Sequence, residues 1–383
     1  MEEKNALLEI RDQLDVIDRQ ITELYKKRMD LCEEVAAYKI KTGKAVFDPE
    51  REAQKIETVQ SYLHTDFDRK AIRELYQQMM TISRRRQFGI LSAHGKAFHA
   101  DFQKLEALPK EGKRVVYQGV EGAYAHLAAR QCFGTEHAFT HVKTWKDAMD
   151  AVVEGEADYA VLPIENSSHG AVSDIFDLLV RYPSLCIVEE VDLHVAHALM
   201  SVAGASMEKL QRIYSHPQAL GQCSAFLEAH PNITAVPVLN TAVAATYVRD
   251  QKDPTIAALA SELSAELYGL QILKRNVNQE KSNTTRFIVV GREKIYTEDA
   301  GKISICFETA HKPGALYNAL GNFIFNDVNM MMIESRPIPE KPFEYRFFID
   351  LEGNLSMPNM INALAGLEDQ ITSLRILGNY GKE

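Results

Sequence analysis

The feature that most constrains the fold is a long apolar seam near the start of the chain. Apolar residues recur there at steps of three and four, which places them on one face of an α-helix. The members of the seam are Leu7, Ile10, Leu14, Ile17, Ile21, Leu24, Leu31, Val35 and Tyr38. A seam of this length predicts one long helix packed against other helices. Gly43 can form the C-terminal cap of this long helix.

Arg28 occupies the place of an apolar residue in this seam. A lone charge on a packing surface is costly, so either a glutamate pairs with Arg28 or the cation serves a ligand. Lys39 returns to nearly the same helix face, whereas Arg11 lies about 25 Å from Arg28 along a straight helix. If Arg11 belongs to the same small-ligand site, it must come from a second subunit, which predicts a helical dimer.

The sequence pattern divides the 383 residues into segments of different fold class. Residues 1–92 have helical periodicity, and residues 93–113 lack periodicity and are expected to form a linker. In residues 114–291 apolar strands alternate with helical stretches, which is typical of a parallel α/β fold. Residues 300–380 fit a small α+β domain of βαββαβ order. We therefore expect a multidomain chain.

Composition limits the partners. The net charge of −10 gives no general attraction for nucleic acid or anionic membranes, so small molecules are the expected ligands. The five cysteines are odd in number and have no zinc-type spacing, which indicates reduced thiols and no metal site. No signal peptide or membrane-length apolar run is evident, so we expect a cytoplasmic protein without a cofactor.

Polar residues at characteristic positions follow the seam. Asp48 precedes Pro49, as a helix N-cap does, and Ser83 shares a helix face with Gln87. Each of these residues could be an ordinary solvated or capping residue. Their order, however, resembles that of the AroQ-type chorismate mutases, which are intertwined all-helical dimers. The matching residues are Arg11, Arg28, Lys39, Asp48, Arg51, Glu52, Ser83 and Gln87.

This resemblance implies a site for chorismate. Arg28 and the partner subunit's Arg11 would hold the two carboxylates, and Lys39 and Gln87 would hydrogen-bond the ether oxygen. The remaining implied residues are Asp48 and Glu52 on the side of the ring hydroxyl, Arg51 as a source of positive potential, and Ser83 in substrate binding. A Claisen rearrangement requires no nucleophile, only a compact conformer and stabilisation of charge on the breaking ether bond.

In the α/β segment, expected strands end in short polar turns that open helices. Such helix N-termini accept carboxylates, and they gather where the carboxyl ends of parallel strands meet. Asn166, Ser215 and Thr241 could each be a simple cap, and so could His216. The stretches GAYAH, PIENSSHGA, SHPQALGQC, NTAVAA and the triplet TRF at residues 285–287 resemble prephenate dehydratases.

The dehydratase resemblance implies a two-lobed α/β domain. It also implies that Thr285 lies in the cleft and hydrogen-bonds to the hydroxyl that leaves prephenate. It implies that Glu165, Asn166 and Gln222 orient this threonine. The implied substrate-binding residues are Ser215, His216, Thr241 and Arg286. His216 is a rival acid, and Arg286 either steers a carboxylate or forms a structural ion pair.

The stretches GALYNAL and ESRP in the last segment resemble a phenylalanine-binding ACT domain. The resemblance implies that L-phenylalanine binds between the ACT domains of two subunits and inhibits the enzyme. The implied residues are Gly314, Ala315, Leu316, Glu334 and Ser335.

The combined expectation is a bifunctional enzyme, a homodimer or tetramer that converts chorismate to prephenate and prephenate to phenylpyruvate. One alternative is a dehydratase whose mutase domain is vestigial or regulatory. A second alternative, of another class, is a sensor protein that binds metabolites without turnover.

Overall fold

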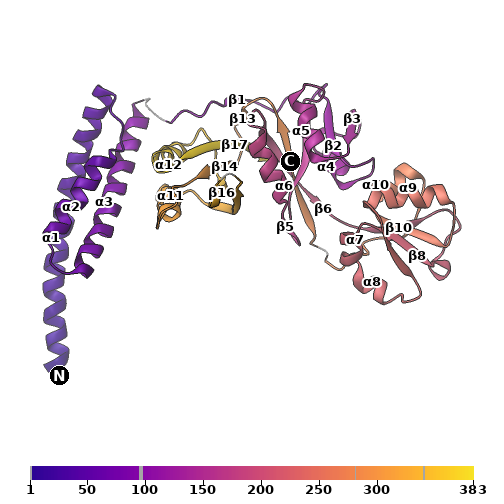
Figure 1. Cartoon of the computed structure of the whole chain (residues 1–383), viewed down its shortest axis with the longest axis horizontal. Coiled ribbons are helices and arrows are strands. Elements are labelled where there is room, and N and C mark those ends of the chain that lie inside the picture. The colour runs from indigo at the N-terminus through magenta and orange to yellow at the C-terminus, as the bar shows by residue number, and fades with distance from the viewer. Residues whose placement is uncertain (1, 95–97, 281, 340) are drawn as a thin grey trace. The chain divides into compact units, whose positions relative to one another are not determined.

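The computed structural model describes residues 2–94, 98–280, 282–339 and 341–383 (Figure 1). Contacts divide the chain into two compact units, which are described separately. Unit 1 comprises Met1–Ala100, Glu308–Asn329 and Leu355–Leu374. Unit 2 comprises Asp101–Phe307, Met330–Asn354 and Arg375–Glu383. Within the described residues, no helix combines the length and apolar character that crossing a membrane requires.

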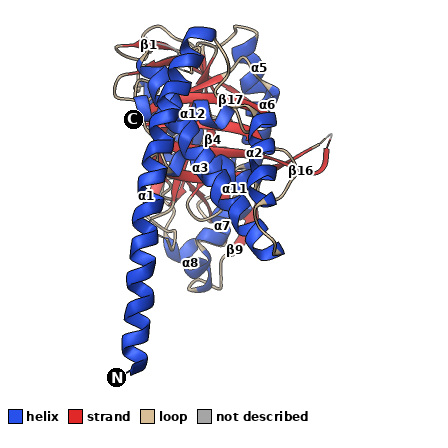
Figure 2. Cartoon of the chain, turned by 90° about the vertical axis from the view of Figure 1, so that its left-hand side faces the viewer, coloured by secondary structure: helices blue, strands red, loops and turns tan. Residues whose placement is uncertain are grey.

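Unit 1 begins with the three helices α1 (Glu2–Thr42), α2 (Pro49–Ser61) and α3 (Asp66–Ala93). As predicted, α1 ends at Gly43, which adopts a φ of 72° and donates its N–H to the Lys39 carbonyl at 2.8 Å. The Asp48 carboxylate caps α2 by accepting the Arg51 N–H at 3.0 Å, which confirms the predicted N-cap. The N-terminal half of α1 extends past the other two helices (Figure 2).

The apolar seam of α1 is exposed in the single chain. The exposed fraction of its side chains runs from 43% at Val35 to 65% at Leu24. Soluble proteins rarely leave an apolar stripe of this length in water, because its burial is worth roughly 25 cal/mol per Å². The seam therefore lacks the packing partner that its pattern predicts, and no described helix of this chain supplies it.

Unit 2 is built on two mixed sheets. The larger has the strand order β15-β16-β14-β17-β6-β12-β4-β2-β3, with β5 paired to β4. Its strands are β2 (Val115–Gln118), β3 (Phe139–Val142), β4 (Tyr159–Asn166), β5 (Gly170–Ala171), β6 (Cys186–His194), β12 (Thr284–Gly291), β14 (Lys302–Glu308), β15 (Met330–Ile338), β16 (Lys341–Glu352) and β17 (Ser373–Lys382). Its helices are α4 (Tyr124–Phe133), α5 (Trp145–Val153) and α6 (Ser173–Arg181).

The smaller sheet has the order β11-β7-β10-β8-β9 and forms the second lobe of the α/β segment. Its strands are β7 (Ala198–Ser201), β8 (Arg212–Ser215), β9 (Thr234–Pro237), β10 (Ile256–Ala260) and β11 (Gln271–Lys274). Its helices are α7 (Pro217–Gln222), α8 (Ser224–Glu228), α9 (Thr241–Gln251), α10 (Glu262–Tyr268) and the 3₁₀ turn η1 (Met207–Lys209). The alternation of strands and helices predicted for residues 114–291 is thereby confirmed.

The expectation of parallel strands was wrong for β12. This strand runs antiparallel to both β4 and β6, because the chain returns from the second lobe at the end where β4 finishes. Side chains of β12 alternate between the two faces of the sheet. Phe287 and Val289 join one hydrophobic core, whereas Ile288 and Val290 join the core on the other face.

The predicted linker 93–113 includes residues 95–97, which lie outside the described residues. Its described part contains a short strand, β1 (Gln103–Leu105), which the sequence did not predict. This strand pairs in parallel with β13 (Ile295–Thr297).

The C-terminal segment has the predicted βαββαβ order: β14, α11 (Ala315–Ile324), β15, β16, α12 (Pro358–Glu368) and β17. Its two helices cluster with unit 1, and its strands lie mainly in unit 2. The helices contact each other closely, since a Cβ on Gly366 would lie 2.6 Å from the Asn322 side-chain oxygen. The strand β17 pairs in parallel with β6 and thereby extends the α/β sheet.

Candidate active sites

The first candidate site lies among α1, α2 and α3. The Arg28 guanidinium donates to the Ser83 hydroxyl and, at 3.5 Å, to the Met79 carbonyl. In the part of the chain that the structure describes, no carboxylate lies within ion-pair distance of Arg28. The structure therefore gives no support to the alternative in which a glutamate of the same chain neutralises this cation.

Lys39 and Glu52 approach the same region from α1 and α2. The Lys39 ammonium donates to the Val46 carbonyl at 2.6 Å. Burial lowers the pKa of Lys39, and the charges of Asp48 and Glu52 partly oppose this shift. Glu52 forms an ion pair with the buried Arg84 of α3. The site thus holds several charges in a partly dry environment, where electrostatic interactions are stronger than in water.

Gln87 completes this helical site. Its side chain is 6% exposed, and its Oε1 atom makes no hydrogen bond in the structure. A buried polar atom without a hydrogen bond costs free energy, so a polar ligand that supplies the missing hydrogen bond would bind favourably at this amide. Three predicted members, Arg11, Asp48 and Arg51, have exposed side chains.

The second candidate site is a pocket of about 400 Å³ between the two lobes of unit 2. Of the predicted residues, Asn166, His216, Gln222, Thr241 and Thr285 line it. Other lining residues are Gln118, Gly119, Ala123, Tyr124, Ala125, Trp145, Pro163, Val195, His197, Gln218, Ala219, Leu239, Asn240 and Phe287. A concave pocket with convergent polar groups is the usual form of a small-molecule site.

Asn166 fixes the hydroxyl of Thr285 within this pocket. The Asn166 Oδ1 atom accepts the backbone N–H groups of Ser168 and His169 at 3.0 and 3.2 Å, so the amide nitrogen must face the other way. That nitrogen donates to Thr285 Oγ1 at 2.9 Å and to Asn283 Oδ1 at 2.8 Å. Since Thr285 Oγ1 serves as an acceptor, its own hydrogen is free to donate to a ligand.

Three other predicted residues lie elsewhere. The buried Ser215 hydroxyl donates to the Leu259 carbonyl at 2.7 Å and is not among the lining residues. Glu165 and Arg286 pair with each other at 3.1 Å and do not line the pocket either. This arrangement favours the structural ion pair as the role of Arg286, and the predicted role of Glu165 in orienting Thr285 stays a prediction.

The comparisons with known proteins match both sites. Residues 10–88 match the type II chorismate mutase family, and residues 115–295 match the prephenate dehydratase family. A bifunctional chorismate mutase/prephenate dehydratase from Enterobacter agglomerans is 34% identical over 391 aligned positions, which cover 100% of this chain and 98% of the relative. The chain belongs to this bifunctional family. It has a chorismate mutase region and a prephenate dehydratase region, and both activities are those of phenylalanine biosynthesis.

Two solved structures resemble the dehydratase part of the chain. A prephenate dehydratase from Arthrobacter aurescens, solved in complex with L-phenylalanine, is 30% identical with a TM-score of 0.65 and covers 70% of this chain and 90% of its own. A protein described as GqqA, a novel type of quorum quenching acylase, is 34% identical with a TM-score of 0.66. The match covers 71% of this chain and 98% of that protein.

The dehydratase pocket contains a hydrogen-bonded chain that the sequence analysis missed. The Tyr124 hydroxyl lies 2.7 Å from His197 Nδ1, and His197 Nε2 lies 2.8 Å from Gln222 Oε1. Burial lowers the pKa of His197, although its bond to Gln222 opposes the shift, so the ring is neutral near pH 7. The Tyr124 hydroxyl also lies 2.9 Å from the Ala196 carbonyl. When it donates to His197 instead, the ring proton is on Nε2 and His197 donates to Gln222. The NH₂ group of Gln222 is then left to donate into the pocket.

The residues predicted to bind phenylalanine occupy two elements. Gly314 adopts a φ of 78° immediately before α11, and Ala315 and Leu316 begin this helix. Glu334 and Ser335 lie on β15. Within the described residues, His, Cys, Asp and Glu side chains nowhere form a group of three that could hold a metal ion.

Proposed function

We propose that Thr285 is the hydrogen-bond donor that assists departure of the ring hydroxyl from prephenate in the interlobe pocket. The carboxylate leaves as carbon dioxide, its bonding electrons complete the aromatic ring, and the C–O bond breaks as the oxygen takes up a proton to become water. A hydroxyl is a poor leaving group, so it needs a donor as this charge develops. The observation that carries the proposal is the bond from Asn166, which leaves the Thr285 hydrogen available.

In the mutase region we propose that Arg28 and the partner subunit's Arg11 hold the two carboxylates of chorismate. Lys39 and Gln87 would donate to the ether oxygen, and Ser83 would hold Arg28 in place. Asp48 and Glu52 would meet the ring hydroxyl, with Arg51 adding positive potential. The absence of a described carboxylate partner for Arg28, whose guanidinium donates to Ser83 and Met79 instead, supports this role.

The proposed assembly is a homodimer or tetramer in which the exposed α1 seam packs against a second copy. The exposed apolar side chains lie along the helix that carries Arg11. Packing of this helix against a second copy would therefore be consistent with a mutase site that two subunits share. Oligomers usually close by symmetric contacts of this kind.

We also propose the domain division 1–92, 93–113, 114–291 and 300–380, in which the last part is an ACT domain in a cytoplasmic protein. L-phenylalanine would bind at Gly314, Ala315, Leu316, Glu334 and Ser335 and inhibit the enzyme. The βαββαβ order supports this, as does the phenylalanine complex of the Arthrobacter relative. Inhibition requires that phenylalanine bind the less active arrangement more tightly.

The similarity to the GqqA acylase raises acyl transfer as a second reaction for the pocket. Acyl transfer by a threonine requires a base beside the hydroxyl. Among the described residues, the side chain that contacts Thr285 Oγ1 is the amide of Asn166, which cannot act as a base. The geometry therefore supports dehydration over acyl transfer.

The test is to supply the purified full-length protein with chorismate and to follow chorismate loss and phenylpyruvate formation. Thr285→Ala should abolish the second step and leave the first, whereas Arg28→Ala should abolish the first and leave conversion of added prephenate. Loss of both steps from either folded variant would contradict two separate sites. Binding without turnover would support the sensor alternative, and turnover of prephenate alone would support a vestigial mutase.

A further inference from the structure

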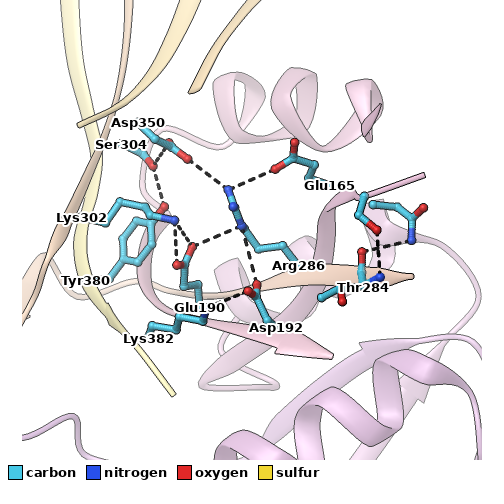
Figure 3. Close-up of polar contacts among 12 residues, drawn as sticks. Glu165, Glu190, Asp192, Thr284, Arg286, Lys302, Ser304, Asp350, Tyr380 and Lys382 are labelled. Carbon is cyan, nitrogen blue, oxygen red and sulfur yellow. Dashed lines mark hydrogen bonds and ion pairs between the residues drawn. The ribbon is translucent and has the colours of Figure 1, made fainter. Parts of the chain in front are cut away.

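A cluster of charged and polar side chains lies beside β12 and is not used in the reaction proposed above. Its members are Glu165, Glu190, Asp192, Arg286, Lys302, Ser304, Asp350, Tyr380 and Lys382 (Figure 3). They come from β4, β6 and β12 of the dehydratase sheet and from β14, β16 and β17 of the C-terminal segment. Four carboxylates face three cations, so the loss of Arg286 or Lys302, the two less exposed cations, leaves negative charge without compensation.

Arg286 lies at the centre of this cluster. Its NH1 atom is 3.1 Å from Glu165 Oε2 and 3.7 Å from Asp350 Oδ2. Its Nε atom is 3.8 Å from both Glu190 Oε2 and Asp192 Oδ1. The four carboxylates raise the pKa of Arg286 although burial, the largest single influence, opposes them. The guanidinium therefore stays charged and joins three strands of the dehydratase sheet to β16.

Lys302 and Lys382 neutralise the other two acids. The Lys302 ammonium donates to both oxygens of Glu190 at 2.7 and 2.6 Å, and Lys382 pairs with Asp192 at 2.7 Å. Neither lysine forms an ion pair with Glu165 or Asp350 among the described residues. Arg286 is the cation within ion-pair distance of both acids. Burial raises the pKa of Asp350, and the Ser304 hydrogen bond and the charges of Lys302 and Arg286 oppose this shift.

Asp350 anchors Arg286 from the C-terminal segment. Its side chain is buried, with 5% of the residue exposed, and it accepts a hydrogen bond from the Ser304 hydroxyl. Ser304 in turn lies 2.6 Å from the Tyr380 hydroxyl. Strands β14, β16 and β17 thus hold Asp350 in one orientation. Hydrogen bonds that fix a carboxylate also fix the cation paired with it.

The alternation of β12 connects this cluster to the pocket. Thr285 and Phe287 line the pocket, and the intervening Arg286 lies opposite Glu165 of β4 and Asp192 of β6. Successive side chains on a strand point to opposite faces, so the cluster and the pocket lie on either side of one backbone. A shift of the β12 backbone at Arg286 would therefore also move the Thr285 hydroxyl.

We propose that Arg286 is a positioning residue for the dehydratase reaction and that Asp350 holds it in place from the C-terminal segment. The proposal rests on the proposed role of Thr285 as the hydrogen-bond donor. It makes the C-terminal strands a structural part of the dehydratase site, because β16 supplies the anchor for the strand that carries Thr285.

The variant that tests this is Asp350→Asn in the full-length protein, which keeps the shape of the side chain and removes its charge. We expect kcat for prephenate to fall by about tenfold to a hundredfold, because small misplacements of a reacting group cost this much. KM should stay within about threefold, since the pocket walls that bind the substrate are unchanged. Chorismate mutase activity, which depends on unit 1, should not change, and a far-ultraviolet circular dichroism spectrum like that of the wild type shows that unit 2 is folded.

Two further variants guard against a folding defect. Ser304→Ala removes the hydroxyl that holds Asp350 but keeps every charge, so it should lower kcat in the same direction and by less. Lys382→Met is the matched control at the exposed edge of the cluster, where an ion pair contributes little, and it should keep wild-type kcat. Wild-type kcat in both Asp350→Asn and Ser304→Ala overturns the proposal.

A double variant that combines Asp350→Asn with Thr285→Ala tests the positioning role separately from the proposed role of Thr285. In Thr285→Ala, Asp350→Asn should cause no further loss of the residual rate, measured with concentrated enzyme over long incubation, because the group that Asp350 positions is already absent. An equal loss in both backgrounds overturns the positioning role alone. Full activity of Thr285→Ala overturns the proposed function and this proposal with it.

Discussion

Asn166 and Thr285 occupy paired positions on β4 and β12, and the amide of Asn166 donates to the hydroxyl of Thr285 at 2.9 Å. Asn166→Asp keeps the shape of this side chain but replaces the donor with an acceptor. The Thr285 hydrogen would then turn toward the new carboxylate and away from the substrate. We expect kcat for prephenate to fall by about a hundredfold, as when one fixed donor is lost from a site of developing charge.

The measurement for Asn166→Asp is steady-state formation of phenylpyruvate from added prephenate. An unchanged far-ultraviolet circular dichroism spectrum is the control for folding of unit 2, and mutase activity of the same sample is the control for unit 1. A dehydratase kcat within about twofold of wild type would contradict the account of how Thr285 is oriented.

The series of hydrogen bonds from Tyr124 through His197 to Gln222 gives a second prediction. Tyr124→Phe removes the hydroxyl that lies 2.7 Å from His197 Nδ1, so neither the ring tautomer nor the Gln222 amide keeps a fixed orientation. We expect kcat to fall by up to about tenfold, the contribution of one hydrogen bond. Tyr159→Phe is the matched control, because its hydroxyl donates to the Pro109 carbonyl outside the pocket.

His197 also predicts a pH dependence of stability. Its pKa is lowered from the usual 6.5 by burial, so the folded protein binds this proton less readily than the unfolded chain. The free energy of unfolding should therefore fall as the pH drops below about 6.5. Urea titrations at pH 7.5 and 5.5 should show a smaller fall in His197→Gln than in the wild type. An equal fall in both proteins would exclude His197 as a source of this dependence.

Gly378 on β17 gives a prediction for the contact between β17 and β6. A Cβ at this position would lie 2.1 Å from the Ile187 carbonyl oxygen, whereas a Cβ at Gly381 of the same strand would meet nothing within 4 Å. Gly378→Ala should lower the free energy of unfolding by about 1–3 kcal/mol or more, as overpacking does. Gly381→Ala is the matched control. Urea titration followed by the fluorescence of Trp145, the one tryptophan of the chain, measures both, and equal stabilities would contradict the packing.

Much of the fold followed from local patterns in the sequence. The end of α1 at Gly43, the Asp48 cap and the apolar strands of both lobes were predictable, because each depends on residues close together in the chain. The pairing of β17 with β6 was not predictable. It joins residues nearly two hundred positions apart, and no local periodicity encodes such a partner.

Some residues of the candidate sites were likewise predictable from the sequence, and others were not. His197 was missed because a single histidine before a strand has no spacing signal, and only the fold brings it to Gln222. Arg84 could have been found, since it lies three positions before Gln87 and therefore shares a helix face with it. Strand alternation predicts that Thr285 and Arg286 face opposite sides of the sheet. Only the structure shows that the side of Thr285 faces the pocket.

The last prediction concerns the shared mutase site. Arg11 and Arg28 lie about 25 Å apart along one helix, so a site that uses both must join two subunits. Arg11→Ala and Arg28→Ala should each be inactive as homodimers. When the two variants are denatured, mixed in equal amounts and refolded, half of the dimers should combine one copy of each.

Such a mixed dimer holds one site with both arginines and one site with neither. The refolded mixture should therefore recover about a quarter of wild-type mutase activity, whereas each variant refolded by itself should recover none. Dehydratase activity, which depends on a separate pocket, should stay constant in all three samples and report the refolded yield. If the mixture stays inactive while dehydratase activity returns, Arg11 and Arg28 do not meet across the dimer. The exposed seam of α1 would then serve assembly without completing the site.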